Sequence, residues 1–530
     1  MAAVPVPPPS ARRALLAGSV GNFVEWYEFG VYGSFATVIA ARFFTPDGGD
    51  RAQALIATYA AFAIAFFFRP LGALLFGRLA DRAGRRPALV LAVCLMTGAT
   101  ALIGALPAYS AIGALAPWLL TLLRSVQGLS AGGEFGGAVS LLTETAPAGR
   151  RGRHGAWQSF TVALGLLTGA GLAAALATLL SESALYAWGW RVPFLLAVPL
   201  GTVALWLRLR LPETAPPPRT PSPDNTTTHA RPHSPAPPHS PTPPDAPASA
   251  HAPAPVGTLP PSDAPAPVGV LPPADSPAPA EAPASAHAPV PVGVLPPAAT
   301  PAPVGVLPPA DAPAPAGLPG LVGPPRTPGR TGGAGTAGVV VLGVGRIMGW
   351  SAAGYTFLVV LPSYLQATLG TTFQQALAAT FAANLGFAAA ILPAGALSDR
   401  VGRRAVMLAG SVLVVLTALP LLHLLRDPAL PVAAKAALLA AAGAMIGLLA
   451  GPGPALLAEM FPTRVRSTGL GLAYALSNAV FSGCAGLIVT ALVRHTGNPD
   501  IPAYYAAGAC ALAVPALLTL RPDDHLRPLR

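Results

Sequence analysis

The chain has 530 residues, of which 53% are hydrophobic and only 10% are charged. Soluble domains carry about 25% charged residues, so this composition excludes an ordinary soluble globular protein. The net charge of +11 comes almost entirely from arginines in short clusters between apolar runs. Such clusters indicate how a chain is oriented in a membrane, and they argue against a nucleic-acid partner.

Apolar runs predict twelve membrane-spanning helices, because a spanning helix needs about 20 apolar residues. Six runs precede a proline-rich stretch and six follow it. The expected helices occupy 14–40, 53–76, 88–107, 118–142, 156–180, 191–211, 337–361, 374–397, 405–425, 432–457, 467–493 and 502–520. The predicted fold class is therefore an all-α membrane protein made of two six-helix bundles.

Composition divides the chain into an N-terminal tail (1–13), a bundle (14–211), a linker (212–335), a second bundle (336–521) and a C-terminal tail (522–530). The linker repeats Pro-Val-Gly-Val-Leu-Pro-Pro, beginning at Pro267, Pro291 and Pro303. It has too few large apolar side chains to form a core, which predicts a disordered, polyproline-prone tether. A docking site for an SH3-like partner is the functional alternative, and the sequence does not identify a protein that would bind the linker.

Arginine clusters fall at the N-terminus, in the loop after every second helix and at the C-terminus. By the positive-inside rule, both termini and the linker are cytoplasmic, as an even number of helices also requires. The expected location is the cell membrane. The cysteines lie in separate apolar segments and the histidines lack ligand spacing, so we expect neither a disulfide nor a metal site.

Two loop motifs recur six helices apart, which indicates a duplicated six-helix unit. One motif pairs Glu144 and Arg151 with Glu459 and Arg466, at an offset of 315 residues. The other, at an offset of 318, comprises Gly77, Asp81, Arg82, Gly84, Arg85 and Arg86 in the first half and Gly395, Asp399, Arg400, Gly402, Arg403 and Arg404 in the second.

The second of these motifs resembles the loop signature of the major facilitator superfamily, which implies that fold and a cytoplasmic gate. Glycines let helix ends approach closely. Asp81 and Asp399 could meet an arginine or the positive end of a neighbouring helix dipole, and so hold the cytoplasmic side shut. The alternative is a charge cluster that only anchors the loop.

Motifs within the helices are similar to those of the metabolite:proton symporter branch of that superfamily. They are Gly21-Asn-Phe-Val-Glu-Trp-Tyr-Glu-Phe29, Phe68-Arg-Pro-Leu-Gly72, Arg124-x-x-Gln-Gly128 and Trp188-Gly-Trp-Arg191. The branch imports 2-oxoglutarate, citrate, shikimate and proline or betaine. Glu28 stands where the family usually has Asp, Phe135 stands where Trp is common, and the long linker replaces a short one.

Charged residues inside a membrane are costly, so each suggests a partner and a function. Glu25, Glu28 and Glu134 are the candidates for proton coupling, because a carboxyl group that alternates between an arginine and an apolar environment can bind and release a proton. We expect a network of Arg69, Arg124 and Glu134 with one helix-one glutamate. The candidates for substrate binding or for this network are Asn22, Tyr32, Arg69, Arg124, Gln127, Arg346 and Tyr355.

The sequence predicts a secondary transporter rather than an enzyme or an ATP-driven pump, since it has no phosphate-binding loop. We expect a monomer without cofactors that uses the proton gradient to import a small carboxylate or zwitterion by alternating access. Examples are a dicarboxylate, a shikimate-like acid, proline and betaine. A drug:proton antiporter and a transport-deficient membrane sensor are the alternatives.

Overall fold

The computed structural model describes residues 8–46, 49–132, 134–210, 333–527 and 529. Within these ranges it describes the backbone alone for residues 8–17, 77, 80, 81, 85, 134, 333 and 334. The predicted linker lies, apart from its last three residues, outside the described chain. The two helical halves form one compact unit.

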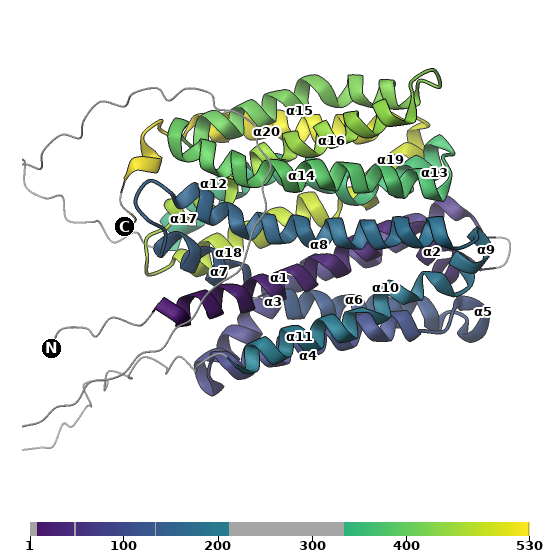
Figure 1. Cartoon of the computed structure of the whole chain (residues 1–530), viewed down its shortest axis with the longest axis horizontal. Helices are drawn as coiled ribbons and strands as arrows, with labels where there is room; N and C mark the ends of the chain where they lie inside the picture. The colour runs from purple at the N-terminus through teal and green to yellow at the C-terminus, as the bar shows by residue number, and fades with distance from the viewer. Residues whose placement is uncertain (1–7, 47–48, 133, 211–332, 528, 530) are drawn as a thin grey trace, which may run out of the picture. The chain divides into compact units, whose positions relative to one another are not determined.

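The first half contains helices that run side by side along the long axis of Figure 1. Several spans consist of consecutive helices. The elements are α1 (Pro8–Ser34), α2 (Ala36–Ile39), η1 (Ala40–Phe44), α3 (Arg51–Ala83), α4 (Arg85–Ala105), α5 (Tyr109–Ile112), α6 (Leu115–Ala131), α7 (Glu134–Glu144), α8 (Arg151–Leu179), α9 (Glu182–Ala184), η2 (Leu185–Gly189), α10 (Arg191–Leu195) and α11 (Ala197–Leu209).

The second half repeats this arrangement, with the wider turns of π-helices interrupting two of its spans. Its elements are α12 (Gly333–Tyr355), η3 (Thr356–Val360), α13 (Leu361–Leu369), α14 (Phe373–Val401), α15 (Arg403–Arg426), α16 (Val432–Ala450), α17 (Gly453–Met460), α18 (Arg466–Ser477), η4 (Asn478–Gly483), α19 (Ala485–Thr496), α20 (Ile501–Leu518) and the 3-10 turn η5 (Asp524–Leu526).

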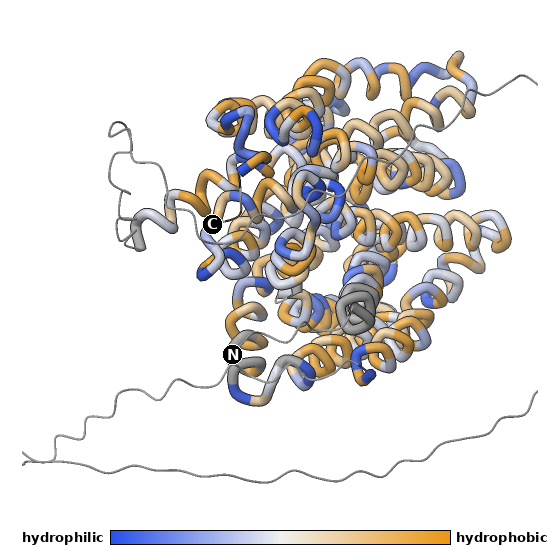
Figure 2. Tube along the Cα trace, turned by 60° about the vertical axis from the view of Figure 1, so that its left-hand side comes forward, coloured by the Kyte–Doolittle hydropathy of each residue, from blue (hydrophilic) through white to orange (hydrophobic). Residues whose placement is uncertain are grey.

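Ten helical segments of the described chain are long and apolar enough to cross a membrane. The segments α1–η1 and α6–α7 lie beside them, and with these two the twelve predicted spans are accounted for. Large apolar side chains such as Phe67, Leu122 and Leu416 are exposed, and hydrophobic residues are frequent along the helices (Figure 2). Such a surface suits contact with lipid.

The same close contacts between helices occur in both halves, at positions separated by the 315 and 318 residues that also separate the loop motifs. A side chain at Gly128 of α6 would collide with the Ala65 carbonyl of α3, and one at Gly443 of α16 would collide with the Ala383 carbonyl of α14. Small residues allow helix backbones this close approach in membranes. In the first half, the approach brings Arg69 of α3 and Arg124 of α6 into the interior, where both are buried.

The bundle has two distinguishable ends. We call the end that carries the helix junctions 83–85, 145–150, 401–403 and 461–465 the arginine-rich end, and the other the opposite end. The helix α17 and the start of α1 lie toward the arginine-rich end, on the left of Figure 1, while α5, α9 and α13 lie toward the opposite end.

Candidate functional site

The two glutamates of α1 meet different partners. Glu25 accepts a hydrogen bond from Arg69 Nη2 at 2.8 Å, and both side chains are buried. This contact forms a direct ion pair between α1 and α3. Breaking such a pair by removing one partner leaves an uncompensated buried charge, which costs about 3–5 kcal/mol.

Glu28 is approached by an amide rather than by an arginine. Gln127 Nε2 lies 3.5 Å from Glu28 Oε2 and donates to Thr100 Oγ1 at 2.7 Å, while Arg124 Nη1 donates to Gln127 Oε1 at 2.7 Å. Glu28 is only 1% exposed, and its Oε1 accepts no hydrogen bond from the described residues. The described residues thus form two clusters, Glu25 with Arg69 and Glu28 with Arg124 through Gln127.

Aromatic rings join these two clusters. The guanidinium carbons of Arg69 and Arg124 both lie 4.9 Å from the centroid of the Phe29 ring. Arg69 also lies over Phe66 at 4.5 Å, and Arg124 over Tyr32 at 4.3 Å. Desolvated cation–π contacts contribute about 2 kcal/mol each, so the rings stabilise cations that few hydrogen bonds satisfy.

The remaining candidates from the sequence lie elsewhere. Asn22 donates to Thr161 Oγ1 at 2.6 Å and thus connects α1 to α8, away from both glutamate clusters. Arg346 donates to Thr519 Oγ1 at 2.7 Å, near the end of α20. The side chain of Glu134 lies outside the described residues, so its expected place in the network stays a prediction.

A cavity lies between the two halves, and five of its thirteen lining residues are aromatic. The first half contributes Trp26 of α1 together with Val162 and Leu166 of α8. The aromatic residues of the second half that line it are Trp350, Tyr355, Phe387 and Tyr474. Arg69 lies 5.6 Å from the Trp26 ring centroid, so the Glu25–Arg69 pair packs behind a lining residue of this cavity, although neither residue lines the cavity itself.

Polar side chains line the cavity where the second half departs from regular α-helix. Asn478 and Ser482 belong to the π-helix η4, and Ser482 Oγ donates to Asn478 Oδ1 at 2.8 Å and to the Ser351 carbonyl at 3.1 Å. π-Helical turns are frequent at functional sites. Sequence reasoning missed these residues, as it missed Trp350 and Tyr474, because regular and π-helical turns have the same apolar sequence pattern here.

At the arginine-rich end, the duplicated motifs pair with each other across the halves. Glu144 accepts from Arg466 Nη1 at 2.5 Å, and Glu459 accepts from Arg151 Nη1 at 3.3 Å. Each glutamate lies at or near the end of a helix, and each arginine begins the next helix. These reciprocal ion pairs connect each half to the other at this end.

Asp399 makes a further connection between the halves. Its carboxylate accepts hydrogen bonds from the backbone N–H groups of Gly152 and Arg153 at 2.7 and 2.9 Å, at the positive end of the α8 dipole. Arg403 holds the same carboxylate at 2.8 Å and also binds Glu459 at 3.0 Å.

The other members of the predicted gate differ in position. Gly84 and Gly402 have φ of 96° and 91°, which lets the chain turn sharply between helices. Arg82 and Arg400 are exposed. Arg86 and Arg404 donate to the carbonyls of Leu209 and Leu520 at the ends of α11 and α20. The side chains of Asp81 and Arg85, and the surroundings of Gly77, lie outside the described residues.

The C-terminal segment after α20 also reaches this end. Arg151 Nη2 donates to the backbone carbonyls of His525 and Arg527, and the former bond is 3.4 Å long. His525 is buried and packs close to Gly402. The described part of the predicted C-terminal tail therefore contacts α8 of the first half and the α14–α15 junction of the second.

Contacts between the halves also close the opposite end. Arg494 of α19 pairs with Asp50, just before α3, at 2.6 Å. Tyr59 Oη and Ser363 Oγ share a hydrogen bond of 2.5 Å, and Thr37 donates to Gln366 at 2.9 Å. The aromatic cavity therefore lies between two ends that are both bridged.

Family models match both halves of this chain. Residues 14–216 match the model described as "Sugar (and other) transporter", and residues 340–530 match "Major Facilitator Superfamily". The ectoine/proline transporter ProP of Corynebacterium glutamicum is 30% identical over 99% of this chain and 86% of that protein. The chain belongs to the major facilitator superfamily. The resemblance stated from its loop motifs is confirmed.

Other members of the superfamily match over different lengths. The alpha-ketoglutarate permease of Escherichia coli is 31% identical over 90% of this chain and 87% of that protein. The glycine betaine/proline/ectoine/pipecolic acid transporter OusA of Dickeya dadantii is 43% identical, but the match covers only 38% of this chain and 40% of OusA. The higher identity is thus confined to less than half of each chain.

Solved structures support the fold. A crystal structure of a D-xylose-proton symporter aligns with a TM-score of 0.63 at 17% identity, covering 98% of this chain and all of that one. At this identity the likeness shows the fold alone, which is the predicted pair of six-helix bundles.

Proposed function

We propose that this superfamily member is a secondary active transporter that imports a small zwitterionic solute together with protons, by alternating access. The observation that carries the proposal is the buried Glu25–Arg69 ion pair, whose guanidinium packs on Trp26 in the lining of a cavity between the two halves. The relatives are named as transporters of proline, betaine, ectoine and 2-oxoglutarate (alpha-ketoglutarate), which agrees with a small organic solute.

The cavity lining favours an ammonium-bearing zwitterion over a dicarboxylate. Five aromatic residues line the cavity, and no arginine, lysine or carboxylate is among its described lining residues. Aromatic faces attract quaternary and other substituted ammonium groups. A dianion would need two cationic partners, whereas Arg69, which packs on the lining residue Trp26, is paired with Glu25, and Arg124 donates to Gln127. Betaine and proline therefore fit the lining better than 2-oxoglutarate does.

The ion pair supplies a way to couple substrate and proton. When Glu25 takes up a proton, it no longer neutralises Arg69, and a buried guanidinium without a counterion is costly. The carboxylate of a zwitterionic substrate can replace that counterion. Proton and substrate then bind favourably together, and release of one favours release of the other.

The arginine-rich end is cytoplasmic in this proposal, by the positive-inside rule. Both termini would then face the cytoplasm, and the reciprocal ion pairs together with Asp399 would form the cytoplasmic gate. Labelling of a Leu529→Cys variant by a membrane-impermeant thiol reagent in inside-out vesicles, but not in right-side-out ones, is the expected result. Labelling in right-side-out vesicles alone would reverse the orientation.

Transport in proteoliposomes tests the function itself. We expect counterflow of labelled glycine betaine or L-proline, and proton uptake when either solute is added, with little response to 2-oxoglutarate or shikimate. Counterflow of 2-oxoglutarate alone would overturn the substrate class and leave symport intact. Binding without exchange would identify a sensor, and proton movement opposite to the solute would identify an antiporter.

A further inference from the structure

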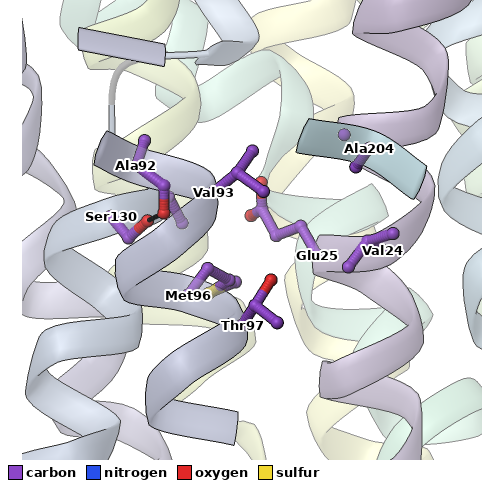
Figure 3. A pocket seen from close by; sticks show the side chains of 10 residues that line it. Val24, Glu25, Ala92, Val93, Met96, Thr97, Ser130 and Ala204 are labelled. Atoms are coloured by element: carbon purple, nitrogen blue, oxygen red, sulfur yellow. Dashed lines mark hydrogen bonds between the residues drawn. The ribbon is translucent and has the colours of Figure 1, made fainter. Parts of the chain in front are cut away.

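A second, smaller cavity lies inside the first half, enclosed by α1, α4, α6 and α11. Its lining includes Gly21, Glu25, Ala92, Thr97, Ser130 and Ala204. Figure 3 shows the Glu25 side chain extending from α1 toward α4 into this space. The carboxylate that pairs with Arg69 is therefore also reached from inside the bundle.

We propose that this cavity is the path by which the proton passes between Glu25 and the arginine-rich end, separate from the path of the substrate. The inference rests on the proposed proton symport and adds the route and the residues that form it. Glu25 would be the coupling carboxylate, with substrate on one side and the proton path on the other.

The two cavities share no lining residue. Trp26 borders the aromatic cavity, whereas its chain neighbour Glu25 borders the inner one. Arg69 connects them, because its guanidinium lies over the Trp26 ring and binds the Glu25 carboxylate. A substrate carboxylate that attracts Arg69 would weaken its hold on Glu25 without entering the space through which the proton moves.

The inner cavity lies near the arginine-rich end. Ala204 is five residues from the end of α11 at Leu209, and Ala92 is seven residues from the start of α4 at Arg85. At 1.5 Å per residue, these positions lie about 8 and 10 Å from the helix ends. A proton that leaves the cavity beside Ala204 and Ala92 therefore crosses about one and a half to two helical turns.

The lining combines small side chains with hydroxyl groups. Gly21, Ala92 and Ala204 leave space next to the carboxylate. Ser130 Oγ donates to the Ala92 carbonyl at 2.5 Å, and Thr97 Oγ1 makes no hydrogen bond to the described residues. The Thr97 hydroxyl can therefore bind a water molecule. In the proposed step, protonated Glu25 gives its proton to water in this cavity, and the carboxylate re-forms its bond with Arg69.

Filling the cavity tests the route. Ala204→Leu adds bulk inside it, and Thr97→Val removes the hydroxyl at nearly constant volume. Thr202→Leu, on the exposed face of the same helix α11, is the matched control. Each full-length variant is reconstituted into liposomes, with counterflow of labelled glycine betaine measured beside betaine-driven proton uptake. Counterflow exchanges solute without net proton movement, so it reports the substrate path alone.

We expect Ala204→Leu to slow proton uptake by about tenfold or more while counterflow stays within about twofold of wild type, with a smaller loss in Thr97→Val and none in the control. Proton uptake at the wild-type rate in a variant that performs counterflow would overturn the route, as would equal loss of both activities. Because overpacking destabilises a helix bundle, Thr97→Val decides the matter if Ala204→Leu does not fold. A wild-type protein without betaine-driven proton uptake would instead refute the proposed function.

Discussion

At the residue scale, the two glutamates of α1 have different electrostatic surroundings although they are three positions apart. Glu25 contacts a guanidinium, whereas Glu28 contacts the neutral amide of Gln127. A glutamine at either position resembles the protonated acid in shape and charge. The two substitutions therefore separate a coupling carboxylate from one that is buried for other reasons.

We expect Glu25→Gln to abolish substrate-driven proton uptake while counterflow persists, because Arg69 is then permanently available to the substrate carboxylate. Glu28→Gln serves as the control on the same helix and should retain proton uptake, slowed by no more than about tenfold. Proton flux and counterflow in proteoliposomes measure both effects. The reverse pattern would assign coupling to Glu28, and Glu134→Gln tests the third candidate by the same assay.

Trp350 is the residue of the second half whose removal should most directly weaken ammonium binding. Trp350→Leu removes one aromatic face from the cavity at a cost of about 0.5–2 kcal/mol, which corresponds to betaine binding about 2- to 30-fold weaker. Trp188→Leu, at an exposed site, should leave binding unchanged. Calorimetric titration of purified protein measures both, and equal affinity in the two variants would argue against the aromatic site.

The sequence allowed some of these residues to be predicted and not others. Glu25, Glu28, Arg69 and Arg124 stand out because charges are rare in apolar helices. Trp350 lies in a helix with few polar residues, so periodicity alone does not show which face turns inward. The sequence also could not identify the residue that pairs with Glu25, because pairing between helices depends on how each helix is rotated about its axis.

At the element scale, the duplicated glutamate–arginine motif forms two ion pairs of unequal burial. The Glu459 side chain is 9% exposed and binds both Arg151 and Arg403, whereas the Glu144 side chain is 41% exposed. Arg466 is only 1% exposed, but solvent at Glu144 weakens that pair, whereas the loss of one partner from a pair that is buried on both sides costs several times more. The two halves of the repeat should therefore contribute unequally to closure of this end.

Glu459→Gln should open the arginine-rich end far more than Glu144→Gln does. Ala156 is buried between α8 and α14 close to Gly395, so Ala156→Cys in a background without the native cysteines reports opening. We expect its thiol labelling rate to rise about tenfold with Glu459→Gln and about twofold or less with Glu144→Gln. Equal labelling rates in the two variants would contradict the conclusion that Glu459 contributes more than Glu144 to closure of this end.

The segment after α20 should stabilise the same closed end. Deletion of residues 521–530 removes the two carbonyl acceptors of Arg151 and exposes Gly402, so we expect faster labelling of the Ala156→Cys thiol. Arg527→Gln is the control, because it leaves the backbone carbonyl of residue 527 in place. If the substitution has the same effect as the deletion, the side-chain charge rather than the backbone contact matters.

Element boundaries followed from the sequence where charge and glycine mark them. The junctions at Gly84 and Gly402 and the helix starts at Arg151 and Arg466 coincide with the loop motifs. The sequence did not predict that each glutamate pairs with the arginine of the other half. A repeat shows that two motifs are equivalent, but it does not show which copy each motif contacts. The contacts of the C-terminal segment likewise depend on tertiary structure that ten residues of sequence do not specify.

At the scale of the whole molecule, the twelve spans and the duplication were accessible from the sequence because hydrophobic length and internal repeats are one-dimensional signals. The conformational state could not be predicted from the sequence. Contacts bridge the halves at both ends, by Asp399 at one and Arg494 at the other. The same residues are present in every state of an alternating-access cycle, so only coordinates can distinguish a closed state from an open one.

The contacts between α8 and α14 and between α7 and α18 also bear on the linker. Asp399, the reciprocal ion pairs and the stacking of Phe135 on Tyr474 at 3.5 Å join the halves through described residues alone. The linker is then needed only to connect the chain. A flexible Gly/Ser linker of about 40 residues has a root-mean-square reach of about 35 Å and can take that role.

We therefore expect replacement of residues 212–332 by such a linker to leave betaine uptake within about twofold of wild type, because the halves associate through their own helices. A variant that keeps the length and composition of residues 212–332 in scrambled order controls for length. Uptake in cells, normalised to the amount of protein in the membrane, measures both. Loss of uptake in the short and the scrambled variants alike would show that the repeated heptamers take part in transport, and loss in the short variant alone would show that the halves need a longer tether to rock against each other.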